Sequence, residues 1–171
     1  MAKRVGKYKV SKREEAVTLL DGGDATGGIN ITPVTLTPAA TVTMTKSANS
    51  GRMNLIPSTA TANDNYILPT ATSVGESYRF CWSGVAADAD NVIFRSSAAD
   101  GLTFTGGILD FKTDETGAGI AVIVYPGADD DKCTITNIQN CDLTFTATST
   151  TNYHVTGYVM STDTQSAFGD L

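Results

Sequence analysis

From residue 27 onward, apolar and polar residues alternate along the chain with a period of two. This alternation is typical of β-strands with one buried face and one exposed face, because successive side chains of a strand point to opposite faces. Turn-forming residues (Gly, Asn, Asp, Ser and Pro) separate the alternating runs. The predicted strands cover residues 29–37, 40–45, 52–56, 65–68, 77–82, 91–95, 102–111, 119–125, 133–138, 141–148 and 152–160.

The regular spacing of these runs predicts an all-β protein with an antiparallel β-sandwich or jelly-roll-like fold. The sequence contains no exact repeat of about 20–50 residues, which argues against a solenoid or a propeller. Only residues 119–125 (GIAVIVY) are continuously apolar. We therefore expect a central strand there, buried on both faces.

The first 23 residues follow a different pattern. Residues 11–14 (SKRE) match a capping box, in which the serine and the glutamate each satisfy a free backbone N–H group at the start of a helix. Val17, Leu19 and Leu20 would form one apolar side of a short helix, and the glycines that follow would end it. A strand through Val17 and Leu19 is the alternative.

The composition agrees with a β-rich domain. Of the 171 residues, 26 are Thr and 16 are Gly, whereas charged residues make up only 18%. Thr is β-branched and suits a half-exposed pleated surface, and Gly is common in turns. We divide the chain into an N-terminal arm with a short helix, residues 1–23, and a β-sandwich domain, residues 24–171.

Charge is distributed unevenly between these two parts. Residues 1–13 contain six cations and no acid, whereas residues 14–171 contain six cations against eighteen anions, a net charge of −12. A basic arm on an acidic domain predicts an acidic partner. Nucleic acid attracts such cations. The acidic domain and the lack of an aromatic stacking motif favour an acidic protein surface instead, and an unstructured solubilising tail is the alternative.

Residues with catalytic chemistry are few. His154 is the single histidine, and neither a second histidine nor a G-x-S-x-G motif accompanies it. A catalytic triad or a metal-bound water would require such partners. We therefore expect a surface or hydrogen-bonded histidine, no enzymatic activity, no cofactor and no metal.

The cysteines and the acidic turns lack the spacing of a metal site. We interpret Cys81, Cys133 and Cys141 as free thiols, with a disulfide between Cys133 and Cys141 across a hairpin as the alternative. Residues 88–91 and 129–131 are rich in Asp but do not match a calcium-binding loop. Asp is common in turns because it bonds its own backbone, and calcium binding is the alternative.

Neither a secretory signal nor a membrane span is expected. The first 25 residues lack the uninterrupted apolar stretch of roughly 7–15 residues found in signal peptides. A helix that crosses a bilayer needs about 20 apolar residues, and no segment of the sequence approaches this length. We expect synthesis in a reducing cytoplasm, in agreement with free thiols.

Residues 43–82 carry a series of short motifs in a fixed order. A Thr-rich strand leads to Gly51 and an apolar strand, and a later strand ends in Leu68 and Pro69. Gly75 follows in a turn of small residues. Tyr78, Phe80 and Trp82 then follow at every second position of the next strand, so they share one face, which we expect in the core. Pro69 would end its strand because it has no N–H group to donate, and Gly75 would allow the turn a positive φ.

This series resembles the head decoration proteins of tailed bacteriophages, and shorter likenesses extend over residues 40–162. The resemblance implies a β-sandwich on the capsid exterior that cements neighbouring capsomers, in many cases as a trimer. We therefore expect a virion structural protein that binds the major capsid protein and also itself, as a homo-oligomer, specifically a trimer.

The arm lies outside the matched region, and we expect it to anchor the protein to the capsid through its cations and apolar side chains. A carbohydrate-binding or adhesin-type module with a glycan partner, or a tail-associated structural protein, is the alternative. The anchoring residues would be Lys3, Arg4, Lys7, Tyr8, Lys9, Lys12, Arg13, Val17, Leu19 and Leu20.

Overall fold

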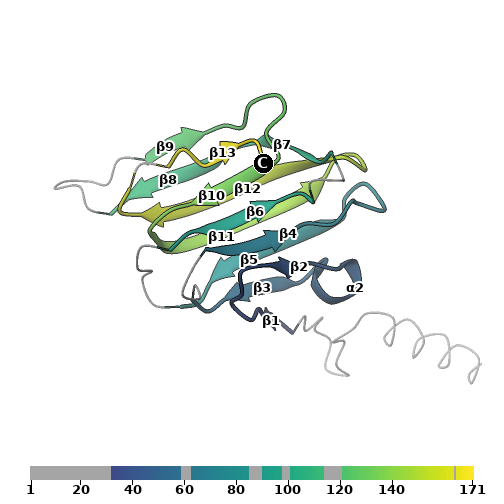
Figure 1. Cartoon of the computed structure of the whole chain (residues 1–171), viewed down its shortest axis with the longest axis horizontal. Coiled ribbons are helices and arrows are strands. Elements are labelled where there is room, and N and C mark those ends of the chain that lie inside the picture. The colour runs from purple at the N-terminus through teal and green to yellow at the C-terminus, as the bar shows by residue number, and fades with distance from the viewer. Residues whose placement is uncertain (1–31, 59–62, 85–89, 98–100, 114–120, 164) are drawn as a thin grey trace, which may run out of the picture. The chain divides into compact units, whose positions relative to one another are not determined.

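The computed structural model describes residues 32–58, 63–84, 90–97, 101–113, 121–163 and 165–171. The described residues from 34 onward form one compact unit of two packed β-sheets and one short helix (Figure 1). The all-β sandwich predicted from the alternation of apolar and polar residues is therefore confirmed. The basic arm and its predicted helix, residues 1–23, lie outside the described residues.

Among the described residues, the two sheets contain eight and five strands. The larger sheet runs, in spatial order, through β1 (Val34–Thr35), β3 (Met53–Ile56), β5 (Ser77–Trp82), β11 (Ile138–Ala147), β12 (Asn152–Ser161), β8 (Ile108–Lys112) and β9 (Ala121–Val124), and β7 (Thr103–Gly106) also pairs with β12. The smaller sheet runs through β13 (Phe168–Gly169), β10 (Lys132–Ile135), β6 (Val92–Arg95), β4 (Asp64–Ile67) and β2 (Val42–Thr43). Helix α2 (Lys46–Asn49) lies between β2 and β3 in the chain.

The first half of the chain passes back and forth between the sheets. β1, β3 and β5 belong to the larger sheet, whereas β2, β4 and β6 belong to the smaller one. Two successive crossings return the chain to the same sheet in the same direction, so the strands of each set pair in parallel. The chain therefore winds from β1 to β6 through the two sheets in turn, as in a short β-solenoid, although the sequence contains no exact repeat.

The predicted antiparallel arrangement is therefore wrong for this half, and both sheets are mixed. Antiparallel pairing joins β11 to β5 and β12, β8 to β9, and β10 to β6 and β13. The reason is that the alternation of apolar and polar residues reports on burial and not on strand pairing. A period of two identifies the buried face of a strand, but it does not tell which sheet receives the strand.

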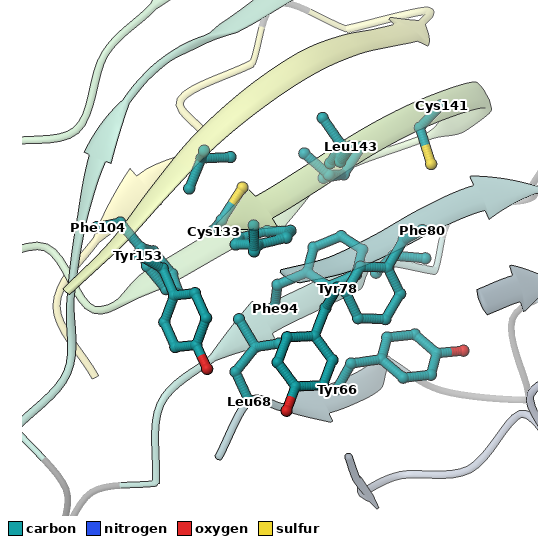
Figure 2. Packing of buried hydrophobic residues seen from close by; sticks show 14 of the residues in the cluster. Tyr66, Leu68, Tyr78, Phe80, Phe94, Phe104, Cys133, Cys141, Leu143 and Tyr153 are labelled. Atoms are coloured by element: carbon teal, nitrogen blue, oxygen red, sulfur yellow. The ribbon is translucent and has the colours of Figure 1, made fainter. Parts of the chain in front are cut away.

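Aromatic side chains from both sheets meet between the layers (Figure 2). Phe80 and Phe145 come from the larger sheet, and Phe94 comes from the smaller sheet. The ring centroid of Phe94 lies 4.7 Å from that of Phe80 and 5.1 Å from that of Phe145. All three side chains are fully buried. Ring pairs at such distances stabilise a core beyond the apolar area that they bury, so this cluster holds the two sheets together.

The central strand that we expected at residues 119–125 is an edge strand in the structure, β9. Among the described strands it is the last of the larger sheet, and it pairs with β8. The exposed fractions of Val122 and Ile123 are 44% and 54%, so this segment is an edge strand and not a central strand buried on both faces. Apolar continuity predicted burial because it cannot tell a strand covered by its own chain from one that is left open.

The connection between β10 and β11 corrects a second expectation. These strands lie in different sheets, so they do not form the hairpin that would place Cys133 opposite Cys141. The turn between them contains Asn137 with φ +46°, a conformation that Asn tolerates. All three cysteines are free thiols, as expected, and burial raises the pKa of Cys141 to about 12.

The predicted strand 102–111 is interrupted in the structure. β7 pairs with residues 152–155 of β12, and β8 pairs with residues 158–161. Between these two stretches, β12 passes through Gly157, which faces Leu143 of β11. An alanine Cβ at this position would lie 2.0 Å from the backbone oxygen of Asp142, and the φ of Gly157 is +132°. The close approach of β11 and β12 therefore requires glycine.

We predict that Gly157→Ala lowers the free energy of unfolding by about 2–4 kcal/mol, because overpacking and a strained positive φ each cost about 1–3 kcal/mol. Urea denaturation measures the change. Gly169→Ala in β13 is the matched control, because nothing lies within 4 Å of its Cβ position. Equal losses in the two variants would contradict the proposed role of Gly157.

Candidate functional site

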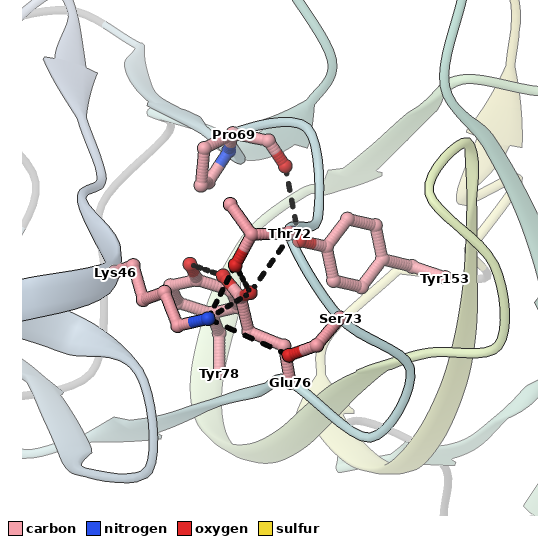
Figure 3. A network of polar contacts seen from close by, with 7 residues as sticks. All are labelled: Lys46, Pro69, Thr72, Ser73, Glu76, Tyr78 and Tyr153. Carbon is pink, nitrogen blue, oxygen red and sulfur yellow. Dashed lines mark hydrogen bonds and ion pairs between the residues drawn. The ribbon is translucent and has the colours of Figure 1, made fainter.

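A polar cluster lies where α2 meets the loop that joins β4 to β5, residues 69–76 (Figure 3). Lys46 of α2 donates a hydrogen bond to the hydroxyl of Thr72. Its Nζ also lies 3.2 Å from Oε2 of Glu76 and 3.4 Å from Oγ of Ser73. One cation thus contacts three residues of the loop.

Helix α2 is fixed to the larger sheet by two buried asparagines. The backbone N–H of Thr45, its N-cap residue, donates to Oδ1 of Asn49 over 2.9 Å. The side-chain amide of Asn49 donates to Oδ1 of Asn54 on β3 over 2.9 Å. The Asn54 amide donates in turn to the backbone oxygen of Arg79 on β5 over 3.0 Å. Because these polar groups are buried and hydrogen-bonded, the position of Lys46 is well defined.

Glu76 is the buried anion of the cluster, with an exposed fraction of 6%. Its Oε1 accepts a hydrogen bond from the Tyr78 hydroxyl over 2.5 Å. Its Oε2 accepts from the backbone N–H and the hydroxyl of Thr72 over 3.1 and 3.0 Å. Burial would raise the pKa of Glu76, but the hydrogen bonds from Tyr78, Thr72 and Lys46 outweigh it and lower the pKa from 4.5 to about 2. The carboxylate is therefore ionised at neutral pH.

Both ends of loop 69–76 are tied to the β11–β12 end of the larger sheet. The hydroxyl of Tyr153 donates to the backbone oxygen of Pro69 over 2.9 Å. The N–H of Gly75 donates to the oxygen of Ala147 over 2.8 Å, and the N–H of Ala147 donates back to the oxygen of Glu76 over 2.8 Å. Between these ties, the loop exposes 71% of Val74. We call this held segment, residues 69–76, the clamped loop.

The motif residues singled out in the sequence surround the clamped loop. Leu68 pairs with β6 one residue beyond β4, and Pro69 then ends the pairing, as predicted. Gly75 has φ +86°, as the turn was expected to require. Gly51 donates its N–H over 2.8 Å to the oxygen of Ser77, the first residue of the strand that carries Tyr78, Phe80 and Trp82. Those three side chains lie in the core.

The cluster has the residue types of a serine–lysine catalytic pair, but its geometry suits a different task. A serine nucleophile needs a neighbouring base with a free lone pair. Here Lys46 faces an ionised carboxylate, and both oxygens of that carboxylate already accept hydrogen bonds from the protein. Glu76 is also too deeply buried to meet a substrate. The arrangement instead fixes the backbone of the clamped loop.

The other chemistry-bearing residues lie apart from this cluster. His154 is exposed on β12, opposite Thr146 of β11, so the expected surface histidine is confirmed. In the acidic turn 129–131, Asp130 accepts a hydrogen bond from the N–H of Gly127 over 2.6 Å, the local bonding expected of Asp in turns. Within the described ranges, no group of three or more His, Cys, Asp or Glu side chains could hold a metal ion.

The ten predicted anchoring residues, Lys3 to Leu20, lie outside the described residues. The residues that sequence reasoning missed are Lys46, Thr72 and Glu76. Lys46 and Glu76 are thirty positions apart, and no spacing rule connects them. The sequence did contain one local indication of helix α2. Thr45 is a residue type that caps helix N-termini and it precedes residues 46–49, where we predicted a turn.

Comparison with known proteins does not assign the chain to a family. No protein-family model matches the chain, and no curated protein matches its sequence. The part of the chain that the structure describes contains no helix long and apolar enough to cross a membrane.

We predict that Glu76→Gln lowers the free energy of unfolding at pH 7 by about 1–3 kcal/mol, because it weakens buried hydrogen bonds to a charged group. The pKa of Glu76 is lower in the folded chain than in the unfolded chain. Its contribution is therefore complete above about pH 5 and is lost as the pH falls towards 2. Denaturant titrations between pH 7 and pH 2.5 should show the difference between wild type and variant shrinking.

The control for this prediction is Asp129→Asn, which removes an exposed carboxylate of the same charge. We expect it to change the free energy of unfolding by less than about 0.5 kcal/mol throughout the pH range. A difference between wild type and Glu76→Gln that stays constant down to pH 2.5 would contradict the ionised, hydrogen-bonded state of Glu76.

Proposed function

We propose that this protein is a non-enzymatic structural protein of a phage virion, which decorates the capsid exterior and stabilises the shell by binding the major capsid protein. The observation that carries the proposal is the separation of charge along the chain. Six cations and no acid lie within residues 1–13, and the remaining residues have a net charge of −12. Such a chain can bind an acidic surface through one end while its body stays soluble.

The architecture of the body supports this proposal. A sandwich whose strands pair between distant parts of the chain is a stable platform, and the clamped loop has a fixed backbone with an exposed apolar tip at Val74. The motif residues that resemble the decoration proteins occupy framework positions around that loop. The resemblance therefore concerns residues that shape the fold, in keeping with a protein that works by its surface.

The aromatic residues favour the capsid over a glycan. A carbohydrate-binding module would need exposed aromatic rings on which sugars can lie. The single tryptophan, Trp82, has an exposed fraction of 9%, and Tyr66, Tyr78 and Tyr153 are fully buried. Tyr125 is exposed by 67%, and it directly follows the apolar edge strand β9.

Decoration would stabilise the shell by mass action. A protein that binds the assembled, expanded shell and not its dissociated subunits adds its binding free energy at each site. The electrostatic part of this binding would weaken as salt screens the charges over about 8 Å at physiological ionic strength.

We predict that removing the six arm cations abolishes binding of the full chain to empty, expanded capsid shells. The variant replaces each of them with Gln, and co-sedimentation with the shells measures binding. Wild-type protein should pellet with the shells and should be released as salt is raised, whereas the variant should stay in the supernatant. The replaced residues are Lys3, Arg4, Lys7, Lys9, Lys12 and Arg13.

The matched control replaces only the four arm lysines with Arg, which keeps the charge, and it should pellet like wild type. If wild-type protein stays in solution with shells of its own phage, the capsid assignment is wrong. Binding to a glycan array would then favour the adhesin alternative, and binding to purified tails would favour the tail component.

A second prediction concerns the shell. Phage particles that carry the decoration should release their DNA at a higher temperature than particles stripped of it, because each bound copy stabilises the assembled state. Thermal release of DNA, followed by the fluorescence of a DNA-binding dye, measures this difference. Equal release temperatures would refute the cementing role while leaving simple attachment intact.

A further inference from the structure

The open edge of the larger sheet is unusually apolar. β9 pairs with β8 on one side, and it is the last strand of the sheet among the described strands (Figure 1). Five large apolar side chains are strongly exposed among the described residues, and three of them lie at positions 122, 123 and 125. Their exposed fractions are 44% for Val122, 54% for Ile123 and 67% for Tyr125.

Apolar side chains cover both faces of this edge. Ile123 lies opposite Leu109 of β8, on the outer face of the sheet. Val122 lies opposite the buried Asp110, on the inner face. An edge strand with one solvent-exposed face would alternate apolar and polar residues. β9 instead has the continuously apolar pattern of a strand that is covered on both faces, which is why its sequence predicted a buried central strand.

The apolar surface continues inward from the edge. Tyr158 of β12 lies opposite Leu109 of β8, and Met160 lies opposite Phe111. The rings of Phe111 and Tyr158 are in edge contact, with centroids 6.3 Å apart. These four side chains are half-buried on the same face as Ile123. The exposed edge is therefore one border of a contiguous apolar surface, as is typical of a docking site.

The other sheet edges are short. β1, β2 and β13, which end the two sheets elsewhere, contain two residues each. Proteins commonly protect edges by keeping them short or by placing charge or proline on them. β9 has four residues, and residues 121–125 contain neither a charge nor a proline. β7 also has four residues without charge or proline, but on the side away from β12 the N–H of Phe104 donates to the oxygen of Asp130 over 2.8 Å. Of the described strands that end the two sheets, β9 is the one without these protections.

We infer that a second copy of this chain covers β9 by pairing with it strand to strand, so that two larger sheets join across a two-fold axis. Charge complementarity selects this partner. The edge carries no charge from residue 121 to residue 128, so charges of a partner strand would be desolvated there without a counter-charge, and an uncharged apolar strand fits best. β9 itself meets that requirement, whereas the basic arm, with six cations in thirteen residues, does not.

Symmetry points to a dimer and not to the expected trimer. A ring of three copies needs two different edges that fit each other, whereas a two-fold pair uses the same edge twice. The other described strands that end the two sheets have two residues each and offer β9 little to pair with, and the free side of β7 is already bonded at Phe104 to Asp130. In an antiparallel pair, directly opposite side chains share a face, so Ile123 would meet Ile123 of the second copy or a residue two positions away.

The size of the contact sets the expected affinity. A stable interface buries about 800 Å² on each partner. A four-residue edge with its flanking apolar side chains is smaller than that, so we expect a micromolar dissociation constant and rapid exchange. This inference does not depend on the capsid proposal, because it concerns the protein alone in solution.

The test is sedimentation equilibrium of the full chain between about 5 and 500 µM. Wild-type protein should shift from monomer to dimer over this range. Ile123→Lys should raise the dissociation constant about tenfold or more, since it places two cations against each other in an apolar contact. Val74→Lys adds the same charge at a more exposed position on the clamped loop and should leave the dimer unchanged.

A mixing experiment removes the concern that Ile123→Lys alters the fold. Ile123→Glu should also be monomeric, and an equimolar mixture with Ile123→Lys should form dimers again, because the opposite charges then meet. Monomeric wild type at 500 µM would overturn the inference. So would a trimer, a dimer insensitive to Ile123→Lys, equal disruption by Val74→Lys, or a mixture that stays monomeric.

Discussion

The contact between aromatic rings of opposite sheets is the interaction on which the rest of this structure depends. Phe94 of β6 packs against Phe80 of β5 and Phe145 of β11, so one side chain of the smaller sheet joins two strands of the larger one. Because the chain changes sheets repeatedly between β1 and β7, neighbouring strands in each sheet come from distant parts of the sequence. Neither sheet can assemble first from local hairpins in this region, and the shared core is what makes both sheets stable together.

This interlaced order explains why buried polar side chains bind the segments that connect strands of different sheets. Each crossing between sheets leaves backbone groups that must find hydrogen-bond partners. Asn54 binds backbone oxygens on both α2 and β5, and Glu76 holds the loop that leads from β4 to β5. Asp110 does the same elsewhere, by accepting hydrogen bonds from the Ser161 hydroxyl and the N–H of Gln165. The clamped loop is thus one of several connecting segments in this fold that buried polar side chains hold in place. Because it is held near its ends, its middle residue Val74 stays exposed.

The sequence predicted the strands well because alternation reports directly on burial. Tyr78, Phe80 and Trp82 were placed on the core face of one strand, and the structure has them there. Partner choice was not predictable in the same way. Whether β5 pairs with β3, β11 or both depends on the sheet that each crossing reaches, and that is decided by packing across the whole domain. The antiparallel prediction failed for this reason.

The polar cluster was unpredictable for a related reason. Lys46 and Glu76 lie on different elements and meet only because α2 is fixed against β3 and β5. Sequence spacing reveals sites whose residues share one helix, strand or loop. It does not reveal a pair that the tertiary fold brings together across thirty positions. The motif residues around the cluster were found because glycine and proline have local backbone roles that stay visible in sequence.

The negative charge of the body opposes contact between copies, whereas the apolar edge favours it. The two effects are compatible because they act over different distances. A net charge of −12 outside the arm makes copies of the body repel one another, which favours solubility and opposes self-association. At physiological ionic strength this repulsion decays over about 8 Å. Strand pairing and apolar burial act at contact, and residues 121–128 are free of charge where that contact would occur. Copies held side by side on a common surface would also meet at a high effective concentration. An edge that pairs in solution only at micromolar concentrations would then join copies that the proposed binding of the arms brings together.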